Sequence, residues 1–262
     1  MLQFCSLYSG SSGNCSLVKT DTTNILIDAG ESTKKIVENL EFIKIDPSSI
    51  DSILVTHEHS DHIKGLGTFS KKFNIPVYAN KETWNAMQKQ REKIAESNIK
   101  IFDFNKFSIG DIEIVPFSIP HDAANPCGFN LYHKNKKMSI ATDIGHMNDK
   151  IINNLMDSSF LLLEANYQPE VLKCSSYPYL LKQRISGPNG HLSNIDAGKT
   201  ISFLVKHGLR NVMLGHLSEE NNFPELAYKT VLEELIDNNC SEDCLNLGVA
   251  NRYIASPIIN VL

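Results

Sequence analysis

The stretch His57–Ile63, HEHSDHI, places three histidines and an aspartate within six positions, directly after the apolar run SILV and a threonine. The apolar run predicts a buried strand that leads into this cluster. Alternate residues of an extended segment point the same way, so His57, His59 and Asp61 can converge on one point. His62 starts the next predicted helix and can face the same cleft. Imidazoles and carboxylates are ligands that divalent transition metals prefer, and four such donors exceed what one open catalytic zinc site uses, which indicates two ions.

Four other acids or histidines each follow a predicted strand. They are Asp28 in NILIDAG, His121 in VPFSIPHD, Asp143 in MSIATDIG and His216 in NVMLGHLS. Functional residues gather on the connections at strand ends, where a rigid sheet holds them in place. We therefore expect these four side chains to meet the histidine cluster at one sheet edge.

The composition is that of a globular protein, with 42% apolar residues over 262 positions and a net charge of −5. We expect one domain over residues 1–262. No run of eighteen apolar residues predicts a membrane helix. The start, MLQFCSLYSG, lacks the features of an export signal, so we expect a cytoplasmic protein whose six cysteines are reduced. The negative charge disfavours a non-specific nucleic-acid coat. Two bound divalent cations would add positive charge at the site itself, where a phosphate group would bind.

Strands followed by helices occur in both halves of the chain. This pattern predicts an α/β protein with two sheets back to back and helices outside. One long helix is predicted over residues 81–96, KETWNAMQKQREKIAE, and residues 167–194 are predicted to be rich in loops.

The order of these motifs, D, then H-x-H-x-D-H, then H, D and H, resembles the metallo-β-lactamase superfamily over nearly the whole chain. The resemblance implies an αββα sandwich, two mixed β-sheets flanked by helices, with a dinuclear site between the sheets. It implies that one ion is held by His57, His59 and His121. The other ion is held by Asp61, His62 and His216. Asp143 bridges the two ions, Asp28 orients a ligand histidine through its free ring nitrogen, and a bridging hydroxide is the nucleophile.

Within the superfamily, four segments resemble the YycJ/WalJ group of DNA exonucleases: SGSSGN, HDAANPCGF, YPYLLKQRISGPNGHLSN and GHLSEENNFPELA. Asp143, where a cysteine would stand in secreted β-lactamases, argues against that activity. The interval between Asp143 and His216 is too short for the inserted domain of the large β-CASP nucleases. This chain departs from the group at Tyr167 and Gln168, where the group carries a histidine and an aspartate.

Several residues are candidates for substrate contact or proton transfer. His191, in the glycine-flanked turn GPNGHLSN, is a candidate general acid, as is Asp61. Ser193 either contacts substrate or only caps the following helix. Arg184 either steers a phosphate backbone or is a solvated surface charge. Ser11 and Asn14 lie in the SGSSGN turn, which either presents N–H groups to an anion or is a plain hairpin turn.

The sequence thus predicts a hydrolase that uses two divalent ions, manganese or zinc with iron as an alternative. Its expected substrate is nucleic acid, DNA more than RNA, and its expected activity is 5′-to-3′ DNA exonuclease. Two alternatives stay open. One is another hydrolase of the same fold that acts on RNA ends, cyclic nucleotides or a small thioester or lactone. The other is a non-catalytic relative that binds nucleic acid.

Overall fold

The computed structural model describes residues 1–241 and 245–261, and these residues form two seven-stranded sheets. The first sheet has the order β14-β1-β2-β3-β4-β5-β6. Its strands are β1 (Gln3–Tyr8), β2 (Cys15–Lys19), β3 (Asn24–Ile27), β4 (Ser52–Leu54), β5 (Val77–Asn80), β6 (Ile99–Phe102) and β14 (Ile259–Asn260). The second sheet has the order β13-β12-β11-β10-β9-β8-β7. Its strands are β7 (Phe107–Ile109), β8 (Ile112–Ser118), β9 (Cys127–His133), β10 (Lys136–Ala141), β11 (Phe160–Glu164), β12 (Asn211–Gly215) and β13 (Asn246–Val249).

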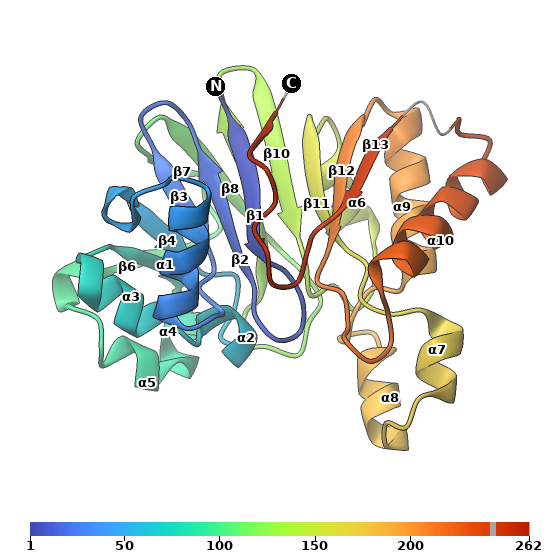
Figure 1. The fold of residues 1–262 in the computed structure, drawn as a ribbon, viewed down its shortest axis with the longest axis horizontal. Helices are drawn as coiled ribbons and strands as arrows, with labels where there is room; N and C mark the ends of the chain where they lie inside the picture. Colours follow the sequence, from blue (N-terminus) through green and yellow to red (C-terminus); the bar gives the residue numbers. More distant parts are fainter. Residues whose placement is uncertain (242–244, 262) are drawn as a thin grey trace.

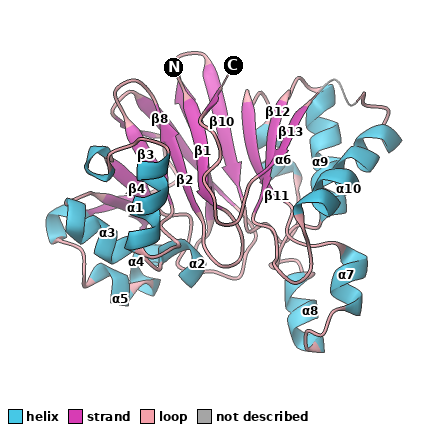
Figure 2. Ribbon diagram, viewed as in Figure 1, coloured by secondary structure: helices cyan, strands magenta, loops and turns pink. Residues whose placement is uncertain are grey.

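Helices cover the outer face of each sheet (Figure 1, Figure 2). Beside the first sheet lie α1 (Thr33–Phe42), α2 (Ser60–Ile63), α3 (Leu66–Phe73), α4 (Lys81–Ala86) and α5 (Gln88–Arg91). Beside the second lie α6 (Asp149–Leu155), α9 (Asn194–Lys206) and α10 (Pro224–Asp237). Two further helices, α7 (Pro169–Cys174) and α8 (Tyr179–Ile185), project beyond the ends of the strands.

Three apolar clusters correspond to the three interfaces of a four-layer sandwich. The first joins helices α1 and α3 to the first sheet, through residues such as Ile36 and Phe69. The second joins α9 and α10 to the second sheet, through residues such as Ile201 and Val231. The third lies between the sheets, where Phe4 of β1 packs against Phe160 of β11, and it contains side chains of both sheets. The predicted αββα sandwich is therefore confirmed.

Each sheet contains both antiparallel and parallel strand pairs, and the parallel pairs determine where the site lies. In the first sheet β3 to β6 are parallel, and in the second β10 to β13 are parallel, so their carboxyl ends share one edge. Registers align those ends, with Ile27 opposite Leu54 in one sheet. Three residues that follow strands turn the chain sharply through the left-handed region: Asp28 (φ 62°), Asp143 (φ 61°) and His216 (φ 55°). Non-glycine residues adopt this conformation rarely, and it collects at functional sites.

Two predictions of local structure were wrong. The helix predicted over 81–96 is broken at Met87, so α4 ends at Ala86 and α5 at Arg91; the turn buries both Met87 and Ile94 in the first core. The loop-rich segment 167–194 contains α7 and α8. Each of these helices has at most seven residues, too few for a helical periodicity of apolar residues to show in the sequence. A separate apolar cluster that includes Leu172 and Ile185 holds the two helices together.

No helix in the described part of the chain is long and apolar enough to cross a bilayer.

Gly30 lets the segment after β3 touch the HEHSDHI turn, so we expect Gly30→Ala to disrupt the site. A Cβ there would overlap the carbonyl oxygen of Asp61 and lie 2.6 Å from the backbone nitrogen of Asn14. We expect a loss of about 1–3 kcal/mol in the free energy of unfolding, measured by urea denaturation with chelator present. Gly248→Ala is the matched control, because a Cβ at Gly248 meets no described atom within 4 Å. Equal stability of the two variants would contradict this account.

Candidate metal centre

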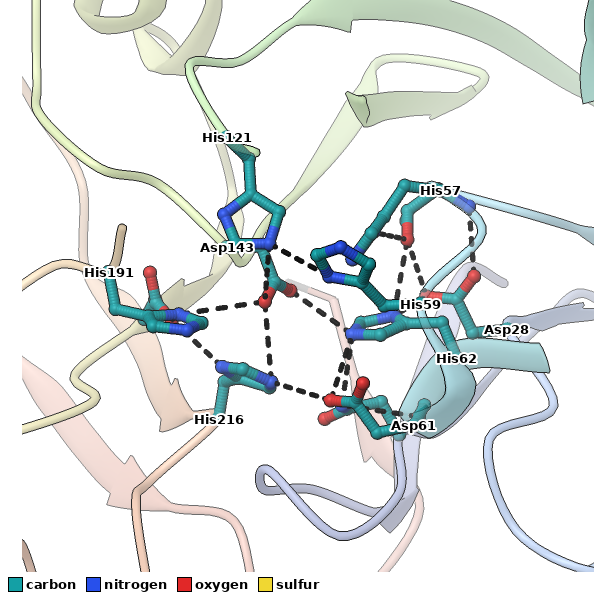
Figure 3. Close-up of polar contacts among 12 residues, drawn as sticks. Asp28, His57, His59, Asp61, His62, His121, Asp143, His191 and His216 are labelled. Atoms are coloured by element: carbon teal, nitrogen blue, oxygen red, sulfur yellow. Dashed lines mark hydrogen bonds and ion pairs between the residues drawn. The ribbon is translucent and has the colours of Figure 1, made fainter. Parts of the chain in front are cut away.

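The seven predicted metal ligands meet at the edge where the parallel strands of both sheets end (Figure 3). They fall into overlapping groups whose donor atoms all lie within 4.8 Å of one another. The groups are His57, His59 and His121; His57, His62 and Asp143; and Asp61, His62 and His216. Asp143 also groups with His216, together with Glu164 and His191. The structure thus brings every one of these residues together, with Asp143 in contact with both sides.

The HEHSDHI turn supplies four of the donors. The chain leaves β4 extended, and His59 at φ −61°, ψ 148° begins helix α2 without capping it through its side chain. The extended part carries His57 and His59, and the first turn of α2 carries Asp61 and His62. This change from strand spacing to helix spacing lets neighbouring positions face one point.

The second sheet supplies the remaining three. His121 follows β8, and its Nε2 lies 3.2 Å from Nδ1 of His59 and 3.7 Å from Oδ1 of Asp143. His216 follows β12, and its Nε2 lies 3.3 Å from Oδ2 of Asp61 and 3.4 Å from Oδ1 of Asp143. Nε2 of His62 lies 3.2 Å from Oδ2 of Asp143.

Most of these histidines have one ring nitrogen anchored outside the centre and the other turned inward. Nδ1 of His62 donates to Asp28 at 2.7 Å, Nδ1 of His121 to the carbonyl oxygen of Gly190 at 2.9 Å, and Nδ1 of His216 to a carboxylate at 2.8 Å. A carbonyl or carboxylate oxygen only accepts, so each bond fixes the proton on Nδ1. When the ring is neutral, Nε2 then has a lone pair for a metal.

Asp28 holds the first sheet's side of the site. Besides His62, it accepts from the backbone nitrogen of Thr56 at 2.8 Å and from the Thr56 hydroxyl at 2.9 Å. The Thr56 hydroxyl also lies 3.0 Å from Nδ1 of His57. A single carboxylate therefore orients His62 directly and His57 through one hydroxyl. These contacts are those expected of the orienting role predicted for Asp28.

Glu164, which the sequence analysis did not identify, holds the second sheet's side. It ends β11 and is fully buried. Its Oε1 accepts from Nδ1 of His216 and of His191, both at 2.8 Å. Its Oε2 accepts from the backbone nitrogens of Ile144 at 2.7 Å and Leu192 at 3.0 Å. The signal was present in FLLLEAN, an apolar run that stops at an acid in the same way as those before Asp28 and Asp143.

Two buried atoms at the centre fit a metal ion. Among the described residues, Nε2 of His57 and Oδ2 of Asp143 make no hydrogen bond, although both are buried. Nε2 of His62 is near that oxygen but without hydrogen-bond geometry. A buried acceptor that makes no hydrogen bond costs about 1–3 kcal/mol, and a coordinated cation would satisfy both atoms. The donor set of imidazoles and carboxylates is also the one that zinc, manganese and iron accept. The residues therefore fit divalent-metal binding.

At the centre, the carboxylates raise the pKa values of His62 and His216, and the histidines lower that of Asp143. Burial lowers the pKa of His216, but Asp143, Asp61 and Glu164 outweigh it and raise that pKa to about 10. Burial likewise lowers the pKa of His62, yet Asp143, Asp28 and Asp61 raise it well above its usual value. Burial raises the pKa of Asp143, and the surrounding histidines bring it well below its usual range.

The other two buried histidines shift the opposite way. Burial is the largest influence on His57 and His121, and it lowers the pKa of each below its usual value. Both are therefore neutral at pH 7, the form that ligates a metal. In Glu164 burial raises the pKa, and His191 and His216 together lower it to about 2, so it is ionised as an acceptor.

His191 lies beside this centre and not inside it. Its Nδ1 donates to Glu164 and lies 3.6 Å from Oδ1 of Asp143, and 18% of its side chain is exposed. It lines a hollow of about 360 Å³ that opens next to the centre and also touches Ser11, Arg184 and Arg252. The structure therefore places His191, Ser11 and Arg184 on one surface, and their contact with substrate stays a prediction.

Two other candidate substrate contacts are used inside the protein. Ser193 is buried, and its hydroxyl accepts from the backbone nitrogen of Asp196 and donates to its side chain, so it caps the helix. Asn14 is buried as well. Its amide nitrogen lies 3.3 Å from Oδ2 of Asp61 and 3.1 Å from Nε2 of His62, and its oxygen accepts from Gly10. Both side chains are therefore engaged in bonds within the protein, and the substrate contacts predicted for them stay untested.

Arg252 is a second residue that the sequence analysis missed. It follows β13, and its Nη2 donates to the carbonyl oxygen of Leu217 at 2.8 Å, which places the guanidinium at the hollow beside His191. It has no carboxylate within 4.0 Å among the described residues, whereas Arg184 pairs with Asp122 at 2.6 Å. Only a glycine at position 10 leaves room for it, because a Cβ there would lie 2.6 Å from Nη1.

The residues that depart from the group pattern have structural roles. The amide of Gln168 bonds to three side chains: it donates to Glu170 and accepts from Asn194 and Thr230. Tyr167 pairs with Ser193 through an isolated bridge and is buried. These positions join the start of α7 to α9 and α10 and take no part in the metal cluster.

In this chain, histidines and ionised carboxylates converge at the edge of an αββα sandwich. Such an arrangement forms the site of a metal-dependent hydrolase. The sequence family described as the metallo-beta-lactamase superfamily matches residues 8–186, more than half of the chain. The chain belongs to this superfamily. Within the superfamily it belongs to the YycJ/WalJ group of exonucleases.

Individual relatives agree with this assignment. "Exodeoxyribonuclease WalJ" of Streptococcus pneumoniae is 39% identical over 232 residues, 87% of this chain and 86% of that protein. "Exodeoxyribonuclease YycJ" of Bacillus anthracis is 37% identical over 235 residues, 89% of each chain. The crystal structure of Zn²⁺-bound PqqB from Methylobacterium extorquens has a TM-score of 0.72 at 14% identity, over 97% of this chain and 99% of that one. At that identity the likeness concerns the fold alone.

Glu164→Gln should destabilise the protein and weaken metal binding. One glutamine oxygen cannot replace two carboxylate oxygens that accept four bonds, so its NH₂ group would face donors. We expect a loss of about 1–3 kcal/mol in the free energy of unfolding with chelator present, and weaker zinc uptake by competition with a chromogenic chelator. The control is Glu233→Gln, which removes only an exposed pair with Lys229 at 3.8 Å. Equal stability of both variants would show that Glu164 does not hold the two histidines.

Metal uptake by the metal-free protein should release protons. Because their pKa values are raised, His62 and His216 are protonated at pH 7 without metal, and each must lose its Nε2 proton to become a ligand. We expect roughly two protons released at pH 7 and an apparent affinity that rises with pH. Calorimetry in buffers of different ionisation enthalpy measures both. His207→Gln changes an exposed histidine and should leave the release unchanged, whereas a heat independent of the buffer would refute the assignment.

Proposed function

We propose that this chain is a 5′-to-3′ DNA exonuclease that hydrolyses phosphodiester bonds at a centre of two divalent ions. The observation that carries the proposal is the position of Asp143, whose two oxygens face donors from both sheets. A carboxylate placed in this way suits a bridge between two ions. The named activities of the two relatives that align over most of the chain support the choice of DNA.

Two sets of donors would hold the ions. His57, His59 and His121 would form one set, and Asp61, His62 and His216 the other. Asp143 lies within 3.7 Å of His121 in the first set and 3.4 Å of His216 in the second. Two divalent ions, manganese, zinc or iron, would supply Lewis-acid activation of water and stabilisation of the charge that develops on the phosphate. The chain's own contribution is to hold these donors rigidly through Asp28 and Glu164.

His191 acts as the proton donor to the leaving oxygen. Its Nδ1 is held by Glu164, so the free Nε2 is the atom available to a substrate in the hollow. Glu164 also fixes the orientation of this ring, and a positioned side chain is what proton transfer to a leaving group requires. Asp61 is the less suitable acid, since burial raises its pKa but His62 and His216 outweigh burial and lower it.

The hollow beside His191 receives the phosphate backbone. Arg252 and Arg184 provide two cations there, in a wall that also carries the exposed acids Glu219 and Glu220 and the exposed Ser11. Arg252 lacks a carboxylate partner among the described residues, so a phosphate oxygen can be its counter-ion. Arg184 would first have to share its bond to Asp122.

Residues 1–262 work as one domain, because donors from both sheets are needed for either ion. The cytosol is the proposed location, since the five cysteines within the described ranges are free thiols. Single histidine or aspartate changes at the centre would then affect both ions together.

The proposal is tested with manganese-loaded protein and DNA labelled at the 5′ or the 3′ end. Wild type should release nucleotides stepwise from the 5′ end. Asp143→Ala should lose at least about a thousandfold in rate, because both ions lose a ligand. His191→Ala should bind metal normally and lose about 10²–10⁴-fold in kcat, the usual contribution of a general acid.

The outcomes separate the alternatives. Cleavage of RNA ends or small esters, with DNA left intact, would reassign the substrate within the same fold. Two bound ions with no hydrolysis of any of these substrates would favour a non-catalytic nucleic-acid-binding protein. His207→Ala, which changes an exposed histidine at the end of α9, is the matched control and should cleave as wild type does.

A further inference from the structure

Helices α7 and α8 enclose a hollow of about 450 Å³ that is separate from the metal centre. Three tyrosines line it, Tyr167, Tyr177 and Tyr179, together with Leu172. Ligand sites for small molecules commonly have volumes of about 300–1,000 Å³ and a mostly apolar, aromatic lining. We call this space the tyrosine hollow.

The three tyrosines differ in how far their rings are exposed, and Tyr179 is the most open to a flat ligand. The structure pairs none of the three with another aromatic ring among the described residues. Tyr179 is 72% exposed, although burying a tyrosine is ordinarily favourable, and Tyr177 is half-buried. Tyr167 is buried and forms the inner wall. Such rings offer faces on which a planar group can stack.

The tyrosine hollow adjoins the hollow that contains His191. Tyr177 lines both this hollow and the one that contains His191. Helix α8 separates the two hollows, with Gln183 and Ser186 facing the tyrosines and Arg184 facing His191. In Figure 1 both helices project past the strand ends, at the same end of the strands as α2, which carries Asp61 and His62.

The charge of this region suits a nucleic-acid strand. Lys173 and Lys182 line the tyrosine hollow, and Arg184 lies on the opposite face of α8. The Lys182 ammonium donates to the carbonyl oxygens of Lys173 and Ser175, which fixes this charge at the end of α7. Lys173 is exposed. A planar ligand in the hollow therefore has the ammonium groups of Lys173 and Lys182 beside it for its phosphates, whereas Arg184 is paired with Asp122.

We propose that the tyrosine hollow binds a nucleobase of the substrate strand by stacking, so that the enzyme engages single-stranded DNA beside the catalytic centre. This inference rests on the proposed function and names its substrate class more closely. A base can enter only after it has left its duplex stack, and stacking on tyrosine tolerates any base sequence. Tyr167, one of the two departures from the group pattern, forms part of this site.

The test compares single-stranded DNA with the same strand carrying abasic tetrahydrofuran nucleotides near its 5′ end. For wild type we expect KM to be about tenfold higher on the abasic strand, with kcat nearly unchanged. Tyr177→Ala and Tyr179→Ala should raise KM on the intact strand by about the same factor and remove the difference between strands. Tyr179→Phe should retain it, and Tyr228→Ala on α10, outside the hollow, should match wild type.

Fluorescence anisotropy with chelator-treated protein gives a second readout that does not need turnover, and the same preference for the intact strand is expected. Equal KM for both strands in wild type, or wild-type KM in both alanine variants, would leave the hollow to another occupant and overturn the proposal. If wild type cleaves DNA under those results, the exonuclease proposal survives alone. If wild type neither binds nor cleaves DNA, both proposals fall.

Discussion

The burial of ionised carboxylates among histidines is the constraint on which the rest of this structure depends. Asp28, Asp143 and Glu164 are each at most 3% exposed, and a carboxylate in such a place is costly unless it is paired. Each is paired with histidines, which are in turn held in one orientation. Without a metal, His62 and His216 are protonated because their pKa values are raised, and their positive charge compensates the negative charge of the carboxylates. With a metal the same carboxylates have a second partner, so the edge of the sandwich is prepared for cations in either state.

The two-sheet architecture makes this arrangement possible. Parallel strands in both sheets deliver their carboxyl ends to one edge, and the residue after several of those strands turns through the left-handed region. Strain of that kind persists only where surrounding contacts hold the residue, and here the hydrogen bonds of the centre do so. His216 shows the coupling directly, because the hydroxyl of Ser9, which follows β1 of the first sheet, accepts from its backbone nitrogen at 2.9 Å. The site is therefore built by contacts across the sandwich and not by one loop.

Much of the site could be predicted from sequence because its signals are local. HEHSDHI is a dense cluster, and His121, Asp143 and His216 each stop an apolar run. Glu164 shares that signal but was missed, since its partners lie 27 and 52 residues away and no local pattern announces them. Arg252 depends on an approach to Gly10 that only the folded chain shows. For the same reason the capping contacts of Ser193 and the inward amide of Asn14 could not be separated from substrate contacts by sequence.

The metal centre and the surface around it are supported by different contacts, and this separation bears on specificity. The donors are anchored by Asp28 and Glu164, whereas α7 and α8 are held by a small apolar cluster and by the bonds of Gln168. Changes at positions such as Tyr167 can therefore reshape the surface that meets the substrate while the carboxylates stay paired. Because a shared catalytic centre cannot itself distinguish among phosphodiester substrates, discrimination must come from side chains outside it. In this chain the segment between β11 and α9 carries the residues proposed for that role, among them Tyr177, Tyr179 and His191.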